Sequence, residues 1–279
     1  MKISDIQQKQ LRFLMIGAHP DDCELKTGGI AIRYSRLGHK VKFVSATNGD
    51  TGHYEIGGAA LAIRRVNEAR AGCATAGIES EVLDIHNNGI EADIRTRELF
   101  IKLIREFRPD IIFTHRLNDY HPDHRRTAML VQDSSYAIRI PNVCPLTPCM
   151  DYTPVIMYMS DSFKKPNPFE ADVVFDIDDV MDTKVKMLDC YESQVYEWLP
   201  WMDGELDTVP KDPIGRLEWL KQKMLDRDGK TAKQFRKELV EKYGAVRGNN
   251  IKCAEVFEVS EYGAPLTEEK MKLYGFTEY

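Results

Sequence analysis

The sequence predicts an α/β fold in which helices cover both faces of a mostly parallel β-sheet, followed by an elaborated C-terminal region. Two observations predict this fold. Apolar runs typical of buried strands alternate with longer segments of helical periodicity through the first half of the chain, and no repeat or low-complexity segment interrupts them. Strands that alternate with helices in this way are joined by right-handed crossovers, which place the helices on both faces of a parallel sheet.

Four strand–helix units account for the first half of the chain. In the first unit, Leu14, Met15 and Ile16 form the apolar run expected of a central strand. In the third, ADIRTRELFIKLIREF carries apolar residues at helical spacing. We expect strands at about 11–18, 40–47, 81–86 and 110–115, and helices at about 25–38, 59–76, 92–107 and from Asp123 onward.

The pattern changes after Pro141. The stretch PNVCPLTPCMDYTP has four prolines in fourteen residues, which predicts an irregular loop. Beyond it we expect strands at 155–159, 172–177 and 253–261, helices at about 179–192, 214–229 and 231–243, and a loop over WLPWMDGELDTVPKDP. Because no flexible linker divides the chain, we expect one domain over residues 1–279, with a core at about 10–195 and a C-terminal extension at about 196–279.

Composition and charge argue against several classes of protein. The formal net charge of -6 and the pI near 5.7 argue against nucleic-acid binding, which usually needs a surplus of basic residues. The longest apolar runs fall far short of a membrane span, and the N-terminal MKISDIQQKQLRF lacks the apolar stretch of a secretory signal. The six cysteines are irregularly spaced, without a CxxC pair, which argues against a disulfide framework and a thiolate zinc site. We therefore expect a reducing, cytoplasmic setting.

The stretch LMIGAHPDDCEL (14–25) begins as a buried strand and ends in a group of polar side chains, His19, Asp21, Asp22 and Glu24. In parallel sheets, ligands bind beyond the carboxyl ends of the strands, at the point where the strand order reverses. Two interpretations are open for this stretch: a hydrated turn in which an aspartate caps the following helix, or one half of a metal site.

A second group of the same kind follows the fourth strand. The stretch THRLNDYHPDHRRTA (114–128) contains a further set of potential ligands, His115, Asp119, His121, Asp123 and His124. Four of the seven histidines of the chain belong to these two strand ends. Since both strand ends are expected at the same edge of one sheet, a shared metal site is favoured over two independent helix caps.

The residue types suit a hydrolytic metal centre. Such a zinc site usually has three protein ligands drawn from His, Asp and Glu, and a water molecule at an open position. His19, Asp22 and His124 would supply two imidazoles and one carboxylate, a set that suits iron(II) as well as zinc. Asp21 would then lie beside the metal-bound water without being a ligand. Because zinc lowers the pKa of such a water to roughly 7, the Asp21 carboxylate can take its proton.

His121 would face the other side of the same water. As an imidazolium it would stabilise a tetrahedral oxyanion and protonate the leaving group. Either Asp123 or Asp119 would hold that imidazole in its charged form.

The motifs AHPDDCE and HPDH together resemble the signatures of the LmbE-like, or PIG-L, family of zinc-dependent N-acetylglucosamine deacetylases. The resemblance covers about residues 10–195 and implies a Rossmann-like three-layer α/β fold. It also implies residue roles that agree with the chemistry above. These are the metal ligands His19, Asp22 and His124, the general base Asp21, and the oxyanion-stabilising acid His121 supported by Asp123.

The resemblance extends to two further positions. The family's RxxE motif after the second strand is matched by Arg65 and Glu68. The resemblance implies that the arginine contacts substrate, but the two residues could equally form an ordinary ion pair on one face of a helix. The mycothiol-type members place a mobile tyrosine two residues before the HPDH histidine, whereas this chain has Asp119 there and Tyr120 one residue later. Asp119 is therefore a second candidate for contact with substrate.

The leading hypothesis is a zinc-dependent N-deacetylase that removes an acetyl group from a small-molecule substrate, an N-acetylated amino sugar or sugar conjugate. Two alternatives are open: a metallohydrolase of another amide or ester on the same scaffold, and a metal- or sugar-binding module without turnover. The spare base Asp21 and acid His121 argue against the module, because binding alone needs neither. The resemblance leaves a homo-oligomer open, and the loop at 49–58 is a candidate lid over the site.

Overall fold

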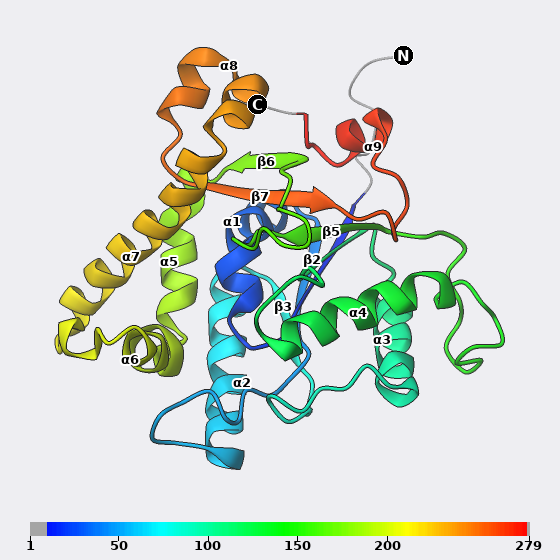
Figure 1. Ribbon diagram of the computed structural model, residues 1–279, viewed down its shortest axis with the longest axis horizontal. Helices are drawn as coiled ribbons and strands as arrows, with labels where there is room; N and C mark the ends of the chain where they lie inside the picture. The colour runs from blue at the N-terminus through cyan, green and yellow to red at the C-terminus, as the bar shows by residue number, and fades with distance from the viewer. Residues whose placement is uncertain (1–9, 278–279) are drawn as a thin grey trace.

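The computed structural model describes residues 10–277, so most of the polar N-terminal segment discussed above lies outside the described part of the chain. A seven-stranded sheet runs through the molecule in the order β3-β2-β1-β4-β5-β7-β6 (Figure 1). The strands are β1 (Arg12–Gly17), β2 (Lys40–Ser45), β3 (Glu79–Val82), β4 (Ile111–Thr114), β5 (Val155–Met159), β6 (Val173–Asp176) and β7 (Ala254–Val259).

The sheet is mostly parallel, as the sequence predicts. Strands β1 to β5 pair in parallel, and of the described strands only β7 runs antiparallel to its neighbours, β5 and β6. In the central strand β1, Phe13 pairs with Val41 of β2 on one side and with Ile111 of β4 on the other. The chain steps outward from β1 to β3 and then returns to the opposite side of β1 for β4. The strand order therefore reverses between β1 and β4.

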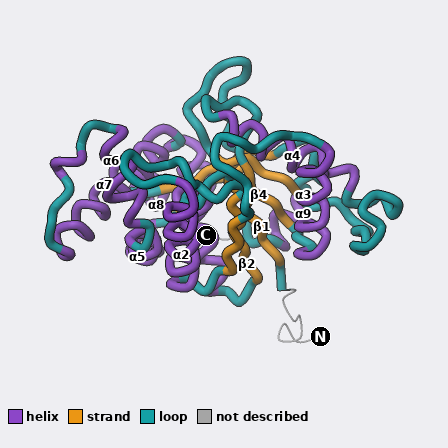
Figure 2. The backbone as a smooth tube through the Cα atoms, turned by 90° about the horizontal axis from the view of Figure 1, so that it is seen from below, coloured by secondary structure: helices purple, strands orange, loops and turns teal. Residues whose placement is uncertain are grey.

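Helices cover both faces of this sheet. Figure 2 shows α2 and α5 on one side of the strands and α3 and α4 on the other. No helix within residues 10–277 combines the length and the apolar character that crossing a membrane requires. The helices are α1 (Asp22–Arg36), α2 (Gly58–Thr75), α3 (Ile94–Phe107), α4 (Pro122–Ala137), α5 (Met181–Asp189), α6 (Leu199–Met202), α7 (Pro213–Gln234), α8 (Arg236–Asn250) and α9 (Glu268–Leu273).

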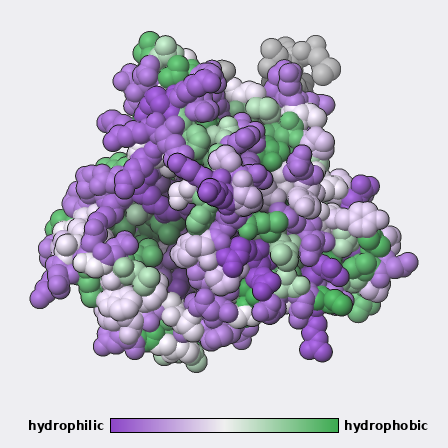
Figure 3. Space-filling view, in the orientation of Figure 1, coloured by the Kyte–Doolittle hydropathy of each residue, from purple (hydrophilic) through white to green (hydrophobic). Residues whose placement is uncertain are grey.

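Alternate residues of β1 enter two separate apolar cores. Phe13 and Met15 belong to the core that also contains side chains of α1, α2 and α5. Leu14 and Ile16 belong to the second core, which contains side chains of α3 and α4. Because successive strand residues point to opposite faces, a strand with both sets buried must lie between two helical layers. Hydrophilic residues, in contrast, cover most of the face shown in Figure 3.

Several elements differ from the sequence prediction: α9 was not expected, and α7 extends to Gln234, beyond the predicted helix end at 229. The third strand, expected at 81–86, spans Glu79–Val82, because the chain beyond Val82 leaves the regular pairing with β2. Past this point, the N–H of Asn48, in the loop after β2, donates to the Ile85 carbonyl. The loop expected at 198–213 is partly helical. Pro200 lies in the first turn of α6, which continues directly from a π-helical turn over Ser193–Trp198.

A buried ionic cluster ties the C-terminal third of the chain to the core. Glu255 on β7 accepts hydrogen bonds from the N–H groups of Gly29 and Ile30 in α1, at 2.8 and 2.9 Å. The ammonium of Lys184 in α5 donates to Glu255 and to Asp228 of α7, at 2.8 Å each. Although burial opposes it, these two carboxylates raise the pKa of the fully buried Lys184. The ammonium group of Lys184 and its two carboxylate partners therefore hold α1, α5, α7 and β7 together.

Replacing Lys184 should destabilise the whole fold. The variant Lys184→Met leaves Asp228 and Glu255 buried without their cation, and we expect a loss of about 3–5 kcal/mol in the free energy of unfolding, measured by urea denaturation. Lys221→Met is the matched control, because it also removes an ion pair between α7 and α5, to Asp182, but at the surface, where such pairs contribute little. Equal losses in the two variants would contradict the role assigned to Lys184.

Candidate active site

Both histidine-containing motifs lie at the point where the strand order reverses. The first connects β1 to α1, and the second leads from β4 into α4. Since β1 and β4 are adjacent and parallel, their carboxyl ends deliver the two motifs to the same edge of the sheet. This is the position at which open α/β sheets bind their ligands.

The two adjacent aspartates of the first motif have different surroundings. The Oδ2 of Asp22 accepts the backbone N–H groups of Ala18 and His19, at 3.0 and 2.8 Å, and so closes the turn. Asp21 occupies the N-cap position of α1, but its side chain makes no capping hydrogen bond. The helix-cap interpretation therefore fails for Asp21, whose carboxylate is available to other partners.

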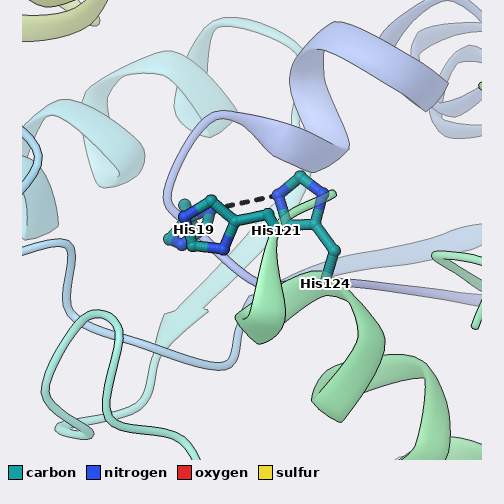
Figure 4. Close-up of side chains that lie close together, drawn as sticks. All are labelled: His19, His121 and His124. Atoms are coloured by element: carbon teal, nitrogen blue, oxygen red, sulfur yellow. Dashed lines mark hydrogen bonds between the residues drawn. The ribbon is translucent and has the colours of Figure 1, made fainter. Parts of the chain in front are cut away.

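The three predicted metal ligands meet in space. His19 Nδ1 lies 3.3 Å from the Asp22 carboxylate and 3.3 Å from His124 Nε2. His124 Nε2 lies 3.5 Å from the other carboxylate oxygen of Asp22. Figure 4 shows the contact between His19 and His124 as a dashed line, with His121 beside them.

These separations fit a shared cation. In a tetrahedral site with bonds of about 2.0–2.2 Å, neighbouring ligand atoms stand roughly 3.3–3.6 Å apart. Two imidazole nitrogens and one carboxylate are also the donor types of hydrolytic zinc sites. Within the described residues, two groups have ligand atoms close enough together to share an ion, and neither is the predicted set. One group joins His121 to His19 and His124, and the other joins His115 to Asp22 and His124.

A carboxylate holds the far nitrogen of each candidate ligand imidazole. His124 Nδ1 lies 2.9 Å from Asp119 Oδ2, and His19 Nε2 lies 3.2 Å from Asp123 Oδ2. Carboxylates in this position fix the orientation of metal-binding imidazoles and raise their basicity. Both carboxylates bond the other two histidines, and Asp123 acts on the His121 imidazole through its charge alone, so the support of His121 by Asp123 or Asp119 stays a prediction.

His121 also differs from its expected charge. It is the N-cap residue of α4, and its Nδ1 accepts the N–H of Asp123 at 3.2 Å, which leaves the ring proton on Nε2. Burial, and then the nearby charges of His19 and His124, lower the pKa of His121 to about 4. The ring is therefore a neutral Nε2–H donor at neutral pH and not the imidazolium that the sequence suggested.

The ligand residues themselves are strongly polarised by one another. Although burial opposes it, hydrogen bonds to Asp123 and Asp22 raise the pKa of His19 to about 9. Burial likewise opposes the ionisation of Asp22, yet His124 and His115 hold the pKa of that carboxyl well below its usual range. These shifts favour ionised carboxylates beside a protonated His19, whose imidazole must lose its proton when a metal binds.

Arg65 holds the predicted base. Its guanidinium is 2% exposed, donates through Nη2 to the Pro20 carbonyl at 2.7 Å and lies 3.4 Å from Asp21 Oδ1. Gly49 and Gly52 pack so tightly on it that a Cβ at either position would lie 2.9 Å from Nη1. Burial raises the pKa of Asp21 to about 6, and the positive charge of Arg65 opposes this rise.

The helical pair between Arg65 and Glu68, left open by the sequence, does not form. It is Arg64 whose Nε lies 3.1 Å from Glu68, and the same carboxylate also accepts the N–H of Ser193 at 2.9 Å. Arg65 instead faces Asp21 and lines the pocket described next.

The two motifs line a pocket of about 460 Å³, together with residues that the sequence analysis missed, among them Lys26, Arg116 and Gln194. Lys26 could have been found, because it follows Asp22 by four residues and so lies on the same face of α1. Gln194 carries no such signal, since it reaches the pocket from a π-helical turn over Ser193–Trp198 in the C-terminal half.

The loop at 49–58 is anchored at the rim of this pocket. Its His53 Nε2 lies 2.8 Å from Glu197, and the ring of Tyr54 stacks between those of His53 and Trp201, with centroids 4.6 and 5.4 Å apart. Thr51 and Gly52 of the same loop line the pocket. The loop therefore contributes to the wall of the site, whereas its role as a lid stays a prediction.

The fold and the site together define a class of protein: an α/β sheet with a candidate hydrolytic metal centre at the point where its strand order reverses. Within that class, residues 14–135 match the family model described as PIG-L: GlcNAc-PI de-N-acetylase. The match includes both motifs, from His19 to His124.

Characterised relatives are deacetylases. Diacetylchitobiose deacetylase of Thermococcus kodakarensis is 28% identical over 214 residues, which cover 72% of this chain and 77% of that protein. The 1D-myo-inositol 2-acetamido-2-deoxy-alpha-D-glucopyranoside deacetylase 1 of Saccharopolyspora erythraea is 26% identical over 248 residues, with 69% of this chain and 81% of that protein covered.

Solved structures confirm the three-layer α/β fold. The N,N'-diacetylchitobiose deacetylase of Pyrococcus horikoshii aligns with a TM-score of 0.67 at 21% identity, over 90% of this chain and 84% of that one. GalB, the 4-carboxy-2-hydroxymuconate hydratase of Pseudomonas putida KT2440, aligns with a TM-score of 0.72 at 20% identity, over 92% and 99%.

Metal retention should distinguish the two adjacent aspartates. We expect the protein loaded with zinc to retain about one ion per chain after dialysis, and Asp22→Asn and His124→Asn to lose it, because each variant removes one of three ligands. Elemental analysis measures the ratio. Asp21→Asn is the matched control and should keep its metal, and a variant Asp21→Asn that loses zinc would contradict the assignment of ligand and base.

The carboxylate behind His124 should tune metal affinity. In Asp119→Asn the imidazole of His124 loses its charged partner at 2.9 Å, so we expect zinc affinity to fall by about 10–100-fold. Competition with a chromophoric chelator measures the dissociation constant. Tyr120→Phe, a change at the exposed neighbouring residue, serves as control, and an unchanged affinity in Asp119→Asn would argue that this carboxylate serves the substrate alone.

Proposed function

We propose that this protein is a metal-dependent N-deacetylase that hydrolyses the acetamido group of an N-acetylated amino sugar or sugar conjugate. One observation carries the proposal: Asp21, a buried carboxylate outside both groups of potential ligands, lies against Arg65 at the edge of the His19–Asp22–His124 site. A binding site needs no such additional carboxylate. Amide hydrolysis needs a base at this place.

His19, Asp22 and His124 would hold the metal. A divalent cation bound there supplies Lewis acidity, which polarises the acyl carbonyl and lowers the pKa of water. Asp21 accepts the proton of the attacking water, and Arg65 keeps its carboxylate in place. His121 donates its Nε2–H to the oxygen on which negative charge develops. Asp21 then returns the proton to the leaving amine.

The relatives support the choice of an amino-sugar substrate. Their names specify diacetylchitobiose and a 2-acetamido-2-deoxyglucopyranoside of inositol, and both share an acetamido group on a hexose ring. The fold alone does not select this reaction, because the hydratase GalB has the same architecture. Whether the substrate is instead another amide or an ester therefore depends on the residues of the pocket wall, because the metal centre would be the same.

Three finer points belong to the same proposal. Zinc is the metal we propose, with iron(II) as the competing candidate for this donor set. We propose a single functional unit, since β7 of the C-terminal third lies inside the sheet between β5 and β6. We also propose a reducing, cytoplasmic setting, which is supported by the free thiols of all six cysteines.

The proposed base makes a direct prediction. Asp21→Asn should reduce kcat by about 10²–10⁴-fold because its amide cannot accept the proton of water, while zinc content stays near that of the parent. Acetate release from N-acetylglucosamine and from N,N'-diacetylchitobiose measures the activity. Retention of full activity in the zinc-loaded Asp21→Asn variant would overturn the mechanism, and a parent protein that releases acetate from neither sugar would count against the amino-sugar substrate.

A further inference from the structure

A single π-helical turn, Ser193–Trp198, brings the side chains of Gln194 and Trp198 into the wall of the candidate active-site pocket. Turns of this kind are rare and occur frequently at functional sites. The turn lies outside both histidine-containing motifs, and the mechanism proposed above uses none of its residues. Its contribution to the site therefore has to be read from its contacts.

The hydrogen bonds around Gln194 use both protons of its amide nitrogen. Nε2 donates to the carbonyl of Gly52 at 3.2 Å and to the hydroxyl oxygen of Ser193 at 3.0 Å. Ser193 accepts here because its own hydroxyl proton goes to the carboxylate of Glu68, at 2.5 Å. Since a carbonyl and an ionised carboxylate can only accept, the direction of every bond is fixed and the amide of Gln194 has one orientation.

The amide oxygen of Gln194 is left without a partner. Within residues 10–277, Oε1 accepts no hydrogen bond, although the residue is 1% exposed. Oε1 is nevertheless not one of the polar atoms that the fold encloses completely, so it keeps accessible surface, and Gln194 lines the pocket. Gln194 therefore presents an oriented, unpartnered acceptor to the pocket.

Two other oxygens of the pocket wall show the difference. Asn87 Oδ1 and Asp161 Oδ2 also lack hydrogen-bond partners, and both residues line the pocket. Both oxygens are fully enclosed, however, and have no surface to offer a ligand. A buried acceptor that a ligand can still reach is therefore found at Gln194 and not at these two positions.

Gln194 lies beside the groups that hold the proposed base. The peptide of Gly52, whose carbonyl accepts from Gln194, packs on Arg65 so closely that a Cβ at Gly52 would lie 2.9 Å from Arg65 Nη1. Arg65 in turn lies 3.4 Å from the carboxylate of Asp21. A sugar whose acetamido group is at Asp21 and the candidate metal ligands therefore has its ring along this wall.

We propose that Gln194 determines specificity by accepting a hydrogen bond from a hydroxyl of the amino-sugar substrate at C3, C4 or C6, the positions that stay free in a conjugate linked through C1. This inference rests on the proposed function, because the hydroxyl belongs to the sugar whose acetamido group is hydrolysed. A hydroxyl suits this acceptor because both groups are uncharged. When the hydroxyl is missing, Oε1 stays buried without a partner, and this penalty rejects the deoxy sugar.

The first test compares N-acetylglucosamine with its 3-deoxy, 4-deoxy and 6-deoxy analogues. In the parent protein we expect the loss of one of these hydroxyls to lower kcat/KM by about 10–100-fold. In Gln194→Met, which lacks the amide oxygen, loss of the same hydroxyl should change kcat/KM by less than about threefold, because the two deletions remove one interaction. A purely structural role would lower kcat/KM for all four sugars by the same factor.

Two further variants serve as controls. Gln132→Met makes the same substitution at a buried glutamine that does not line the pocket and whose amide donates to the Tyr158 hydroxyl, so it should retain the full discrimination. Gln194→Glu keeps an oxygen acceptor at the site and should retain the discrimination as well. This variant tests the inference even if Gln194→Met does not fold.

Three outcomes would overturn the inference. The first is a parent protein that accepts all three deoxy sugars as readily as N-acetylglucosamine. The second is a folded Gln194→Met variant that discriminates as the parent does. The third is a Gln194→Glu variant without discrimination.

Binding without turnover separates this inference from the proposed function. Calorimetry on the zinc-loaded parent and on Gln194→Met compares glucosamine with its three deoxy analogues, and we expect one hydroxyl to strengthen binding about tenfold in the parent alone. Such discrimination, with no acetate release from any acetylated sugar, would support the contact of Gln194 and overturn the deacetylase proposal. Acetate release with equal use of all the deoxy sugars would do the reverse.

Discussion

The site depends on one carboxylate, that of Asp22. It accepts the backbone N–H groups of Ala18 and His19, which fixes the turn after β1, and it lies within 3.5 Å of nitrogens on His19, His115 and His124. His115 directly follows β4 and His124 lies in α4, so a single side chain joins the two strand ends. A carboxylate with this many donors stays ionised despite its burial, and the same charge provides the attraction that a metal site needs.

The sequence could predict this much because the relevant information is local. Apolar runs identify the strands, the helices between them impose a parallel sheet, and parallel strands must end at one edge. Two histidine-rich motifs placed at two such ends therefore converge whatever the details of packing. The same argument explains why the sequence could predict that His19, Asp22 and His124 lie close together, since each belongs to a motif that follows a strand end.

What the sequence could not predict is which polar group faces which. Asp119 and Asp123 stand on either side of His121 in the chain, yet their carboxylates turn to His124 and His19, because the orientation of the first turn of α4 decides the pairing. Glu255 and Lys184 are buried partners from distant segments, and no local pattern marks either of them.

The different roles proposed for Asp21 and Asp22 follow from the groups that surround each carboxylate. Asp22 faces imidazoles and backbone donors, which stabilise its charge, whereas Asp21 faces Arg65 in a buried position with no capping bond. The pKa of Asp22 is therefore held well below its usual range, and that of Asp21 is raised to about 6. Two identical groups whose environments separate their pKa values in this way are suited to different tasks, one as a permanent anion and one as a proton carrier. The fold creates this difference by placing Asp22 inside the first turn of α1 and Asp21 just before it. A hydrolytic site can therefore be built from two consecutive residues of one type.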